Sequence, residues 1–345
     1  MNPVLQVLAA LYGRVAAMRA EAYRRGWLKS RRLNQPVISV GNLTTGGTGK
    51  TPLAASIAKL LLARGFKPSI LTRGYRRRRG PSLLALAPAS GRAPDPRQTG
   101  DEPALLAAVL PEVPIVICAD RYRAGKYAEE HFGVNVHLLD DGFQHLQLAR
   151  DLDIVALDAT QEIADQAILP AGRQREPATA LKRAQIIVLT RSDLASPAKV
   201  AQLESQVLEI HPGIPIFRSV TKLCGFVGIR TGSRLPPDAL EGRRVYAFCG
   251  VGNPGAFFTS LRRWGMAVAG EQIFADHHVY TDREVAHLVL NASARGSARL
   301  VTTEKDAANI PPSWKADLNA FACVIEAEMD DPEAFEQALV TRLLH

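Results

Sequence analysis

The chain's clearest chemical signature lies in residues Val37–Pro52, which read VISVGNLTTGGTGKTP. Val37–Val40 is a β-branched, apolar run, which is typical of a buried parallel strand. A glycine-rich turn follows, and Lys50-Thr51 opens a helical pattern that stops at Gly65. A strand, a glycine-rich loop, Lys-Thr and a helix in this order predict a loop that binds the phosphates of a nucleoside triphosphate.

Each part of this loop has its own chemistry. Glycines let backbone N–H groups converge on phosphate oxygens, and the helix N-terminus adds a favourable dipole. Lys50 would bring a positive charge to the β- and γ-phosphates, and the Thr51 hydroxyl can ligate Mg²⁺. We expect the nucleotide to contact Thr45, Gly46, Gly47, Thr48, Gly49, Lys50, Thr51 and Pro52.

One position departs from the general consensus for such loops. The strict pattern requires glycine at position 44, and this chain has Thr44. The alternative is a glycine-rich turn that is followed by Lys-Thr by chance. The flanking strand and helix favour the phosphate loop.

Two adjacent carboxylates end another apolar run, Leu138-Leu139-Asp140-Asp141. In a phosphate-loop protein this place holds the second Mg²⁺ anchor, and we expect Asp140 and Asp141 to hold the ion directly or through water. The alternative is a surface pair that caps a turn. His145 follows after a Gly-Phe-Gln turn and would return toward the site, although a lone histidine is more often structural.

Asp101, in Gly100-Asp101-Glu102-Pro103, permits two interpretations. Its carboxylate could be the general base for an alcohol nucleophile, or it could cap the helix that follows. Spacing alone favours the cap.

Two further motifs indicate other functions. Gly250–Gly255 contains G-x-G-x-x-G after an apolar run, with Glu271 near the ribose-binding spacing, which would suit a nicotinamide dinucleotide. Pro254 weakens this interpretation because it removes an N–H. Thr190–Asp193 is similar to the guanine-reading loop of GTPases, but Arg191 stands where lysine is expected. Asp276-His277-His278 has no further ligands in the sequence that would make it a metal site.

Composition indicates an ordinary globular protein, and the length of 345 residues suits two domains. The four cysteines lie far apart without a CxxC, so neither a metal site nor a disulfide framework is implied.

The positive charge of the chain is concentrated near its N-terminus. The first 35 residues hold seven basic residues and one acid, and they carry +6 of the chain's net +8. A second basic cluster comprises Arg73 and the run 76–79.

Apolar residues in the N-terminal segment follow helical spacing, at Val4, Leu8, Leu11, Val15 and Met18. This segment is too short to span a bilayer, which needs about 20 apolar residues, and its charges lie on the wrong side for a secretory signal. Two interpretations stay open: a helix on an anionic membrane surface, or a helix that packs on its own domain.

Strands and helices alternate after the phosphate loop, so we predict an α/β fold with a mostly parallel sheet covered on both faces. Ligands bind at the carboxyl ends of such strands, where Thr51, Arg73, Asp140-Asp141 and the 190s loop would gather. The segment 80–100 reads as a loop or hairpin. The expected divisions are a basic helix over 1–35, a P-loop NTPase-type domain over 36–216, a linker over 217–243 and a smaller α/β domain over 244–345.

Eight motifs, in order along nearly the whole chain, resemble the tetraacyldisaccharide 4′-kinases, the lipid A kinases of Gram-negative bacteria. They are GNLTTGGTGKTP at 41–52, LTRGY at 71–75, GDEP at 100–103, LLDDGFQH at 138–145, LPAGRQREP at 169–177, GVGNPGAF at 250–257, DHHVY at 276–280 and TTEKDA at 302–307. Thr44 is normal for this family, and the G-x-G-x-x-G becomes part of its second domain.

The resemblance implies ATP- and Mg²⁺-dependent phosphorylation of the 4′-hydroxyl of a tetraacyldisaccharide 1-phosphate. It also implies a peripheral enzyme on the cytoplasmic face of the inner membrane, held there by the N-terminal helix, with neither a nucleic acid nor an obligate protein partner.

The resemblance also implies roles for single residues. Asp101 and His277 match positions used as a base dyad on the sugar hydroxyl, and Asp140 and Asp141 match the metal and γ-phosphate region. Arg175 and Glu176 match a polar motif near the site. Three alternatives are kept as rivals: a GTPase-like switch, a nicotinamide oxidoreductase, and a small-molecule kinase whose N-terminal helix is only structural.

Overall fold

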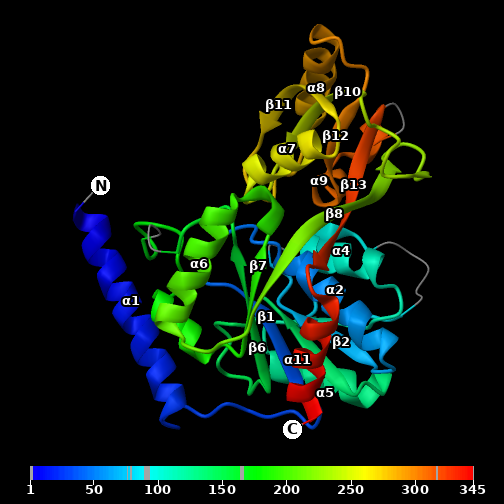
Figure 1. Cartoon of the computed structure of the whole chain (residues 1–345). Coiled ribbons are helices and arrows are strands. Elements are labelled where there is room, and N and C mark those ends of the chain that lie inside the picture. Colours follow the sequence, from blue (N-terminus) through cyan, green and yellow to red (C-terminus); the bar gives the residue numbers. More distant parts are fainter. Residues whose placement is uncertain are drawn as a thin grey trace. The chain divides into compact units, whose positions relative to one another are not determined.

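The structure, a computed structural model, describes residues 3–75, 77, 80–88, 94–163, 167–315 and 318–344. The chain divides into two compact units (Figure 1). Unit 1 comprises Met1–Val220 and Ala327–His345, and unit 2 comprises Thr221–Glu326.

Unit 1 is built on a mostly parallel sheet with the strand order β8-β7-β6-β1-β5-β2-β4-β3. Its strands are β1 (Val37–Gly41), β2 (Pro68–Thr72), β3 (Leu83–Leu86), β4 (Ile115–Cys118), β5 (Val136–Asp140), β6 (Leu152–Asp158), β7 (Ile186–Thr190) and the beginning of β8 (Ile216–Gly228). β3 joins the edge of this sheet antiparallel to β4. β1 lies between β5 and β6, and Val40 is in register with Asp140 and Ile154.

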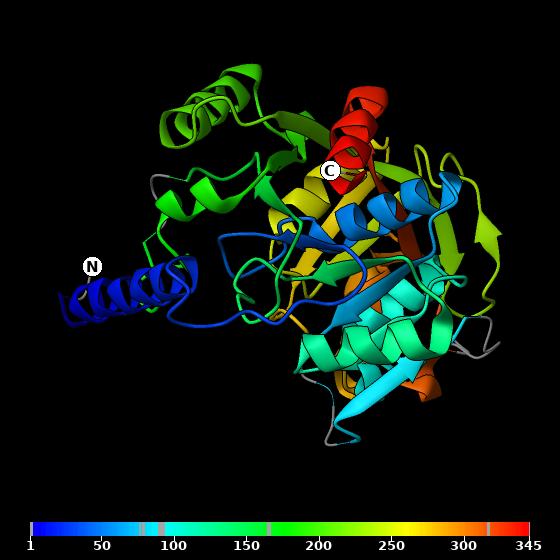
Figure 2. The ribbon, with the colours of Figure 1, turned by 90° about the horizontal axis from the view of Figure 1, so that it is seen from below.

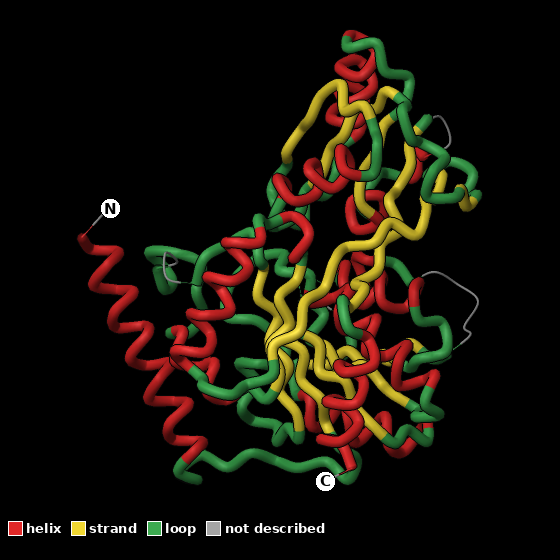
Figure 3. The backbone as a smooth tube through the Cα atoms, viewed as in Figure 1, coloured by secondary structure: helices red, strands yellow, loops and turns green. Residues whose placement is uncertain are grey.

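Helices cover both faces of this sheet, as Figure 3 shows in red around the yellow strands. One face packs on α2, α4 and α11, and the other packs on α5 and α6. The helices of unit 1 are α1 (Pro3–Arg24), α2 (Lys50–Ala63), α3 (Pro96–Thr99), α4 (Asp101–Val109), α5 (Arg121–Phe132), α6 (Pro197–Ile210), α11 (Pro332–Leu344) and the 3₁₀ turns η1 (Ala178–Arg183) and η2 (Ser192–Leu194). Because both faces are covered, the strands read as continuous apolar runs.

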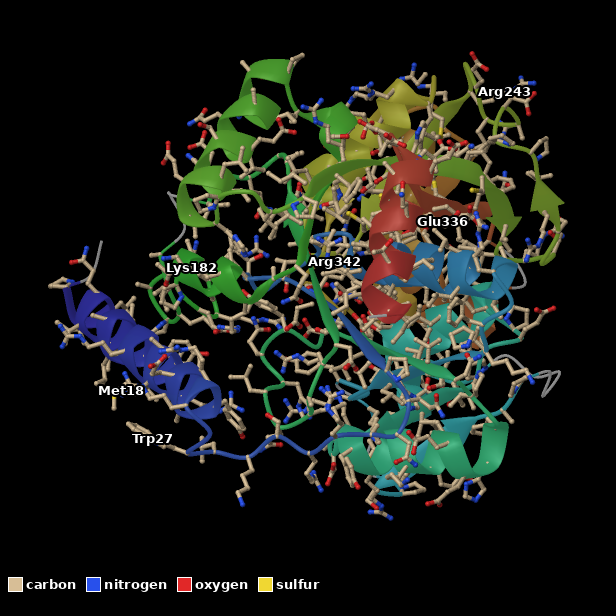
Figure 4. The ribbon with its side chains drawn as sticks, turned by 60° about the horizontal axis from the view of Figure 1, so that its bottom comes forward. Met18, Trp27, Lys182, Arg243, Glu336 and Arg342 are labelled. Atoms are coloured by element: carbon tan, nitrogen blue, oxygen red, sulfur yellow. The ribbon has the colours of Figure 1, made fainter. Side chains whose placement is uncertain are left out.

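The last helix of the chain belongs to unit 1. Phe335 and Leu339 of α11 are buried in the same cluster as the apolar face of α2. The Ser56 hydroxyl donates to the Ala327 carbonyl at 2.6 Å, and Arg64 forms an ion pair with Glu336, which Figure 4 labels on α11.

Unit 2 has its own core around a run of parallel strands. Its strands and helices are β9 (Arg234–Leu235), β10 (Arg244–Cys249), α7 (Pro254–Arg263), β11 (Ala267–Ile273), α8 (Asp282–Ala294), β12 (Leu300–Thr303), α9 (Glu304–Ala308), α10 (Pro312–Lys315) and most of β13 (Ala320–Met329). The strand order β11-β10-β12-β13 is parallel throughout. Its apolar residues form two clusters, which lie around Phe258 and around Phe248.

The expected fold class is confirmed, and the six strands expected between 37 and 190 lie within a few residues of their predicted places. The divisions of the chain differ from the expected ones. Residues 217–243 include strands β8 and β9 instead of an open linker, because β8 runs on from unit 1 into unit 2. The chain also returns to unit 1 at Ala327, so the segment 244–345 is not one domain.

The segment 80–100 differs in part from the expected loop. It contains β3 and the short helix α3, which Asp95 caps through the Arg97 N–H at 2.9 Å. Residues 89–93 of this segment lie outside the described residues, as do Arg76, Arg78 and Arg79 of the second basic cluster.

Candidate active site

β1 delivers the chain into the phosphate loop, residues 42–49, and α2 begins directly after it at Lys50. Gly49 precedes the helix with a φ of +78°, a left-handed conformation that favours glycine. The first turn of α2 therefore points its N–H groups into the loop with no capping side chain at Gly49. This is the arrangement that binds phosphate at a helix N-terminus. Thr51 and Pro52 are half-buried in that first turn.

Three side chains from two segments of the chain hold the phosphate loop in shape. The Asn42 side-chain amide donates to the Thr48 hydroxyl at 2.9 Å, and the Thr190 hydroxyl donates to the Thr48 carbonyl at 2.8 Å. The Arg191 guanidinium donates to the Gly47 carbonyl at 2.7 Å. None of these three bonds uses an N–H group of the loop; within the chain, the N–H groups of Thr45 and Thr48 donate to the carbonyls of Arg173 and Gly46.

Arg191 is a site residue whose role the sequence did not reveal. It follows β7 with a φ of +56° and forms an ion pair with Asp158, whose side chain is almost fully buried. β6 and β7 are parallel neighbours, and Asp158 is in register with Thr190 at their carboxyl ends. In the sequence, the only indication of a special role was that Arg191 stands where the guanine-reading loop of a GTPase has lysine.

The predicted pair Asp140-Asp141 ends β5, the neighbour of β1, so the sheet brings it beside the phosphate loop. Lys50 Nζ lies 3.5 Å from Asp141 Oδ1. Arg175 Nη1 donates to both oxygens of Asp141, at 2.9 and 2.8 Å. The chain bends sharply here, because Asp141 has a φ of +53°. Lys50, Asp141 and Arg175, all predicted as site residues, are thus joined in one cluster.

The two carboxylates have opposite electrostatic environments. Burial, together with the charges of Asp141 and Glu102, raises the pKa of Asp140 to about 7. Burial alone would also raise the pKa of Asp141, but the charges of Lys50 and Arg175 lower it below its usual value. Titratable groups whose environments separate their pKa values in this way are typical of functional sites.

Asp140 is also suited to a cation that is not part of the chain. Its Oδ1 is buried and has no hydrogen-bond partner among the described residues. No group of three or more His, Cys, Asp or Glu side chains in the described part of the chain could hold a metal by itself. Mg²⁺ usually takes one or two carboxylates and completes its shell with phosphate and water, so this donor set fits Mg²⁺ beside a nucleotide.

The segment 167–175 connects this cluster to the loop. The Arg175 N–H donates to the Leu43 carbonyl at 2.7 Å, and the Thr45 N–H donates to the Arg173 carbonyl at 2.7 Å. Glu176, the next predicted residue, is buried and accepts two bonds from Arg183, at 2.8 and 3.0 Å. In the structure Glu176 therefore anchors its own segment, whereas Arg175 reaches Asp141.

Asp101 is half-buried at the first position of α4. The N-cap is Gly100, whose carbonyl accepts from the Ala104 N–H at 3.2 Å, so the capping role expected for Asp101 falls to its neighbour.

Arg73, the predicted cation after β2, is exposed. Arg121 is, like Arg191, a cation that the sequence did not reveal, and it is buried. Its pKa is lowered mainly by burial and also by the charge of Arg73.

His145 is half-buried two residues beyond Phe143. Burial, followed by the charges of Arg121 and Arg150, lowers its pKa to about 4. A histidine with that pKa is neutral near pH 7, so His145 can accept or donate a hydrogen bond there but does not bring a charge to the site.

In unit 2, the predicted His277 lies between β11 and α8 with a φ of +61°. The glycine motif that suggested a dinucleotide site lies next to it. The Gly250 N–H donates to the buried Asp306 carboxylate at 2.8 Å, and the Ala256 N–H donates to Asn253 at 3.1 Å. A carboxylate beside the first glycine would repel a pyrophosphate, which argues against the nicotinamide rival.

The parallel α/β sheet, the phosphate loop at the start of α2 and the paired carboxylates at the end of β5 define unit 1 as a P-loop phosphotransferase. Residues 1–344 match the profile of the family LpxK, Tetraacyldisaccharide-1-P 4'-kinase. The chain belongs to this family of lipid kinases.

Individual relatives agree with the family match. The tetraacyldisaccharide 4'-kinase of Geobacter metallireducens is 40% identical over 97% of this chain and 96% of its own length. That of Geobacter sulfurreducens is 39% identical over 98% and 93%. The solved "apo" form of LpxK from Aquifex aeolicus, in complex with ATP, is 31% identical and has a TM-score of 0.74, covering 97% of both chains.

Proposed function

We propose that the cluster at the ends of β1 and β5 performs the phosphoryl transfer of this ATP-dependent kinase of lipid A biosynthesis. The acceptor is the 4′-hydroxyl of a tetraacyldisaccharide 1-phosphate. The observation that carries this assignment is the convergence of Lys50, Asp141 and Arg175 beside a buried oxygen of Asp140 that has no hydrogen-bond partner in the described part of the chain. Phosphoryl transfer needs charge neutralisation and positioning more than covalent help, and this cluster offers both.

The phosphate loop binds the triphosphate through backbone N–H groups of residues 45–51, among which those of Thr45 and Thr48 already donate to the Arg173 and Gly46 carbonyls. Lys50 lies at the start of α2 and supplies its charge to the β- and γ-phosphates. In the structure, Lys50 Nζ lies 3.5 Å from Asp141 Oδ1. Arg175 keeps Asp141 ionised and oriented, so the carboxylate can release Lys50 to the phosphates without being displaced itself.

Thr51, Asp140 and Asp141 would hold Mg²⁺. When bound, the ion neutralises charge on the β- and γ-phosphates. The raised pKa of Asp140 fits this role, because a carboxylate whose ionisation is opposed by burial gains most when a cation binds beside it.

Asp101 is the proposed general base for the sugar hydroxyl, and from the family resemblance we also propose a catalytic role for His277. General-base help contributes about 10²- to 10⁴-fold to such rates. Asp101→Ala should therefore lower turnover by about that factor and leave the affinity for ATP nearly unchanged. Glu112→Ala, which removes an exposed carboxylate beyond the end of α4, is the matched control. A parallel loss of ATP binding in Asp101→Ala would refute the base role.

The direct test of the reaction is incubation with γ-labelled ATP and a lipid A disaccharide precursor in detergent. Label should move to the lipid, and GTP should be a poorer donor. Transfer of label to water alone, with and without the lipid, would point to the GTPase-like rival instead.

We further propose that α1 places the enzyme on an anionic membrane surface. A helix on the surface of a soluble protein usually buries its large apolar side chains, whereas α1 exposes them. The residues that face the body of unit 1 are small, since Ala9 and Gly13 are its buried positions. Large apolar side chains are exposed; Val4, Val7, Leu11, Val15 and Met18 are each more than half exposed.

At 3.6 residues per turn these two faces lie about 180° apart on the helix. Figures 1 and 2 show α1 along one side of unit 1, and Figure 4 shows Met18 and Trp27 pointing away from the chain. Exposed apolar patches of this kind mark interaction sites, and the adjoining basic residues favour an anionic partner. Among the described residues, no helix combines the length and hydropathy that a bilayer-spanning segment requires.

The membrane proposal is tested with vesicles that contain anionic lipid. Val15→Glu places a charge in the exposed apolar face and should reduce binding to these vesicles by about tenfold or more. Gln6→Glu adds the same charge outside that face and should reduce it far less. Equal binding of Val15→Glu and the unmodified chain would favour a purely structural helix. In the cell, we propose the cytoplasmic face of the inner membrane as the site of this association.

A further inference from the structure

The loop that carries His277 is held by the side chain of Lys305. Lys305 Nζ donates to Asp276 Oδ1 at 3.0 Å and lies 3.3 Å from His277 Nε2. Lys305 comes from α9, the short helix after β12, and its side chain is mostly buried. One ammonium group thus contacts two consecutive residues of a loop in which His277 has a left-handed backbone.

The residue next to Lys305 fixes the backbone of the same region. Asp306 accepts bonds from the Gly250 N–H at 2.8 Å, the Tyr280 hydroxyl at 2.9 Å and the Thr303 hydroxyl at 2.6 Å. The Gly250 carbonyl in turn accepts from the His277 N–H at 3.2 Å. Helix α9 therefore controls both the backbone position of His277, through Asp306, and its ring, through Lys305.

The contact with Lys305 determines where the imidazole carries its proton. A lysine ammonium has three donors and no acceptor, so His277 Nε2 must accept and the ring proton must lie on Nδ1. Asp276 Oδ2 would favour the opposite arrangement, but it lies 3.9 Å from Nε2, beyond hydrogen-bond distance. Of these two contacts, the shorter one, to Lys305, favours a proton on Nδ1.

We propose that Lys305 is a positioning residue for this kinase: it holds the His277 ring with Nε2 as acceptor and thereby presents the Nδ1–H as a donor. A donor N–H suits the orientation of a carboxylate or a hydroxyl oxygen. The effect of Lys305 on turnover rests on the role proposed above for His277, whereas the position of the ring proton does not.

The tautomer is tested by long-range ¹⁵N–¹H correlation spectra of the full chain with ¹⁵N-labelled histidine. The His277 signal is identified by its absence in His277→Gln. We expect a protonated Nδ1 and an unprotonated Nε2. In Lys305→Met the signals should shift toward the other tautomer or a mixture. A protonated Nε2 in the unmodified chain would overturn the proposal.

Kinetics provide the second test, with label transfer from ATP to the lipid precursor as the readout. Lys305→Met should lower kcat by about 10²-fold, the cost of a misplaced group, with little change in KM for ATP. Lys305→Arg keeps the charge and donor and should recover part of that loss. Lys222→Met, which changes an exposed lysine of the same unit, is the control.

Asp276→Asn covers the case in which Lys305→Met does not fold. It removes the ion-pair partner but keeps the lysine, and it should lower kcat less than Lys305→Met and broaden the tautomer distribution. Unchanged kcat and an unchanged tautomer in folded Lys305→Met or Asp276→Asn would overturn the positioning role. Absence of lipid phosphorylation by the unmodified chain would instead count against the proposed function and leave the spectra as a separate result.

Discussion

Replacing Asp140 with asparagine should make unit 1 more stable at pH 8 while it abolishes kinase activity. The reason is the raised pKa of this buried carboxyl, about 7 against 3.8 for an ordinary aspartate. Between these pH values the folded chain keeps a proton that the unfolded chain has released. The free energy of unfolding therefore falls as the pH rises from about 4 to 7, and the ionised carboxylate destabilises the folded chain above pH 7.

The size of the effect follows from the shift. About three pKa units at about 1.4 kcal/mol each give about 4 kcal/mol as an upper bound at pH 8, and almost nothing at pH 4. An asparagine side chain cannot ionise, so Asp140→Asn escapes this cost. The quantity to measure is how the difference in unfolding free energy between the variant and the unmodified chain changes with pH.

The two units need not unfold together, so the assay should report on unit 1 itself. Hydrogen exchange of the β1 and β5 amides, without nucleotide and with a chelator present, meets this need. Asp141→Asn is the matched control. Its carboxylate has a lowered pKa, so the stability that it contributes is present above its usual pKa and lost in acid. Asp141→Asn should thus be destabilised at neutral pH. A pH-independent difference for Asp140→Asn would refute the reasoning.

Two further outcomes are expected. Arg191→Met removes the bond to the Gly47 carbonyl and leaves the buried Asp158 carboxylate without its ion pair. ATP affinity, measured by calorimetry, should therefore fall by about tenfold or more, and the variant should also lose stability. Gly13→Leu should destabilise the packing of α1 by about 1–3 kcal/mol, because a Cβ at this position would lie 2.9 Å from Ile168 Cδ1. Adding Ile168→Ala should offset much of that loss. Equal stability of Gly13→Leu and the double variant would contradict the contact.

The central strands could be predicted from the sequence because both of their faces are buried and they read as apolar runs. The proximity of Lys50 and Asp141 could be predicted as well, since parallel strands bring their carboxyl ends to one edge. β3 was missed because four residues between proline-rich segments carry little periodic signal, and it is only an edge strand.

The supports of the site were harder to predict. Arg191 and Lys305 act through contacts across the fold, with Gly47 in one case and with Asp276 and His277 in the other. Nothing in their local sequence specifies those partners. Single charged residues with distant partners can be interpreted only when the strands that carry them are placed.

The return of the chain to unit 1 has a consequence for biosynthesis. Phe335 and Leu339 complete the core around α2, yet they are separated from it by all of unit 2. During translation, unit 1 therefore lacks part of its core until residues 327–345 leave the ribosome. While unit 2 is being made, the apolar face of α2 lacks this cover, and a chaperone would have most to protect during that interval.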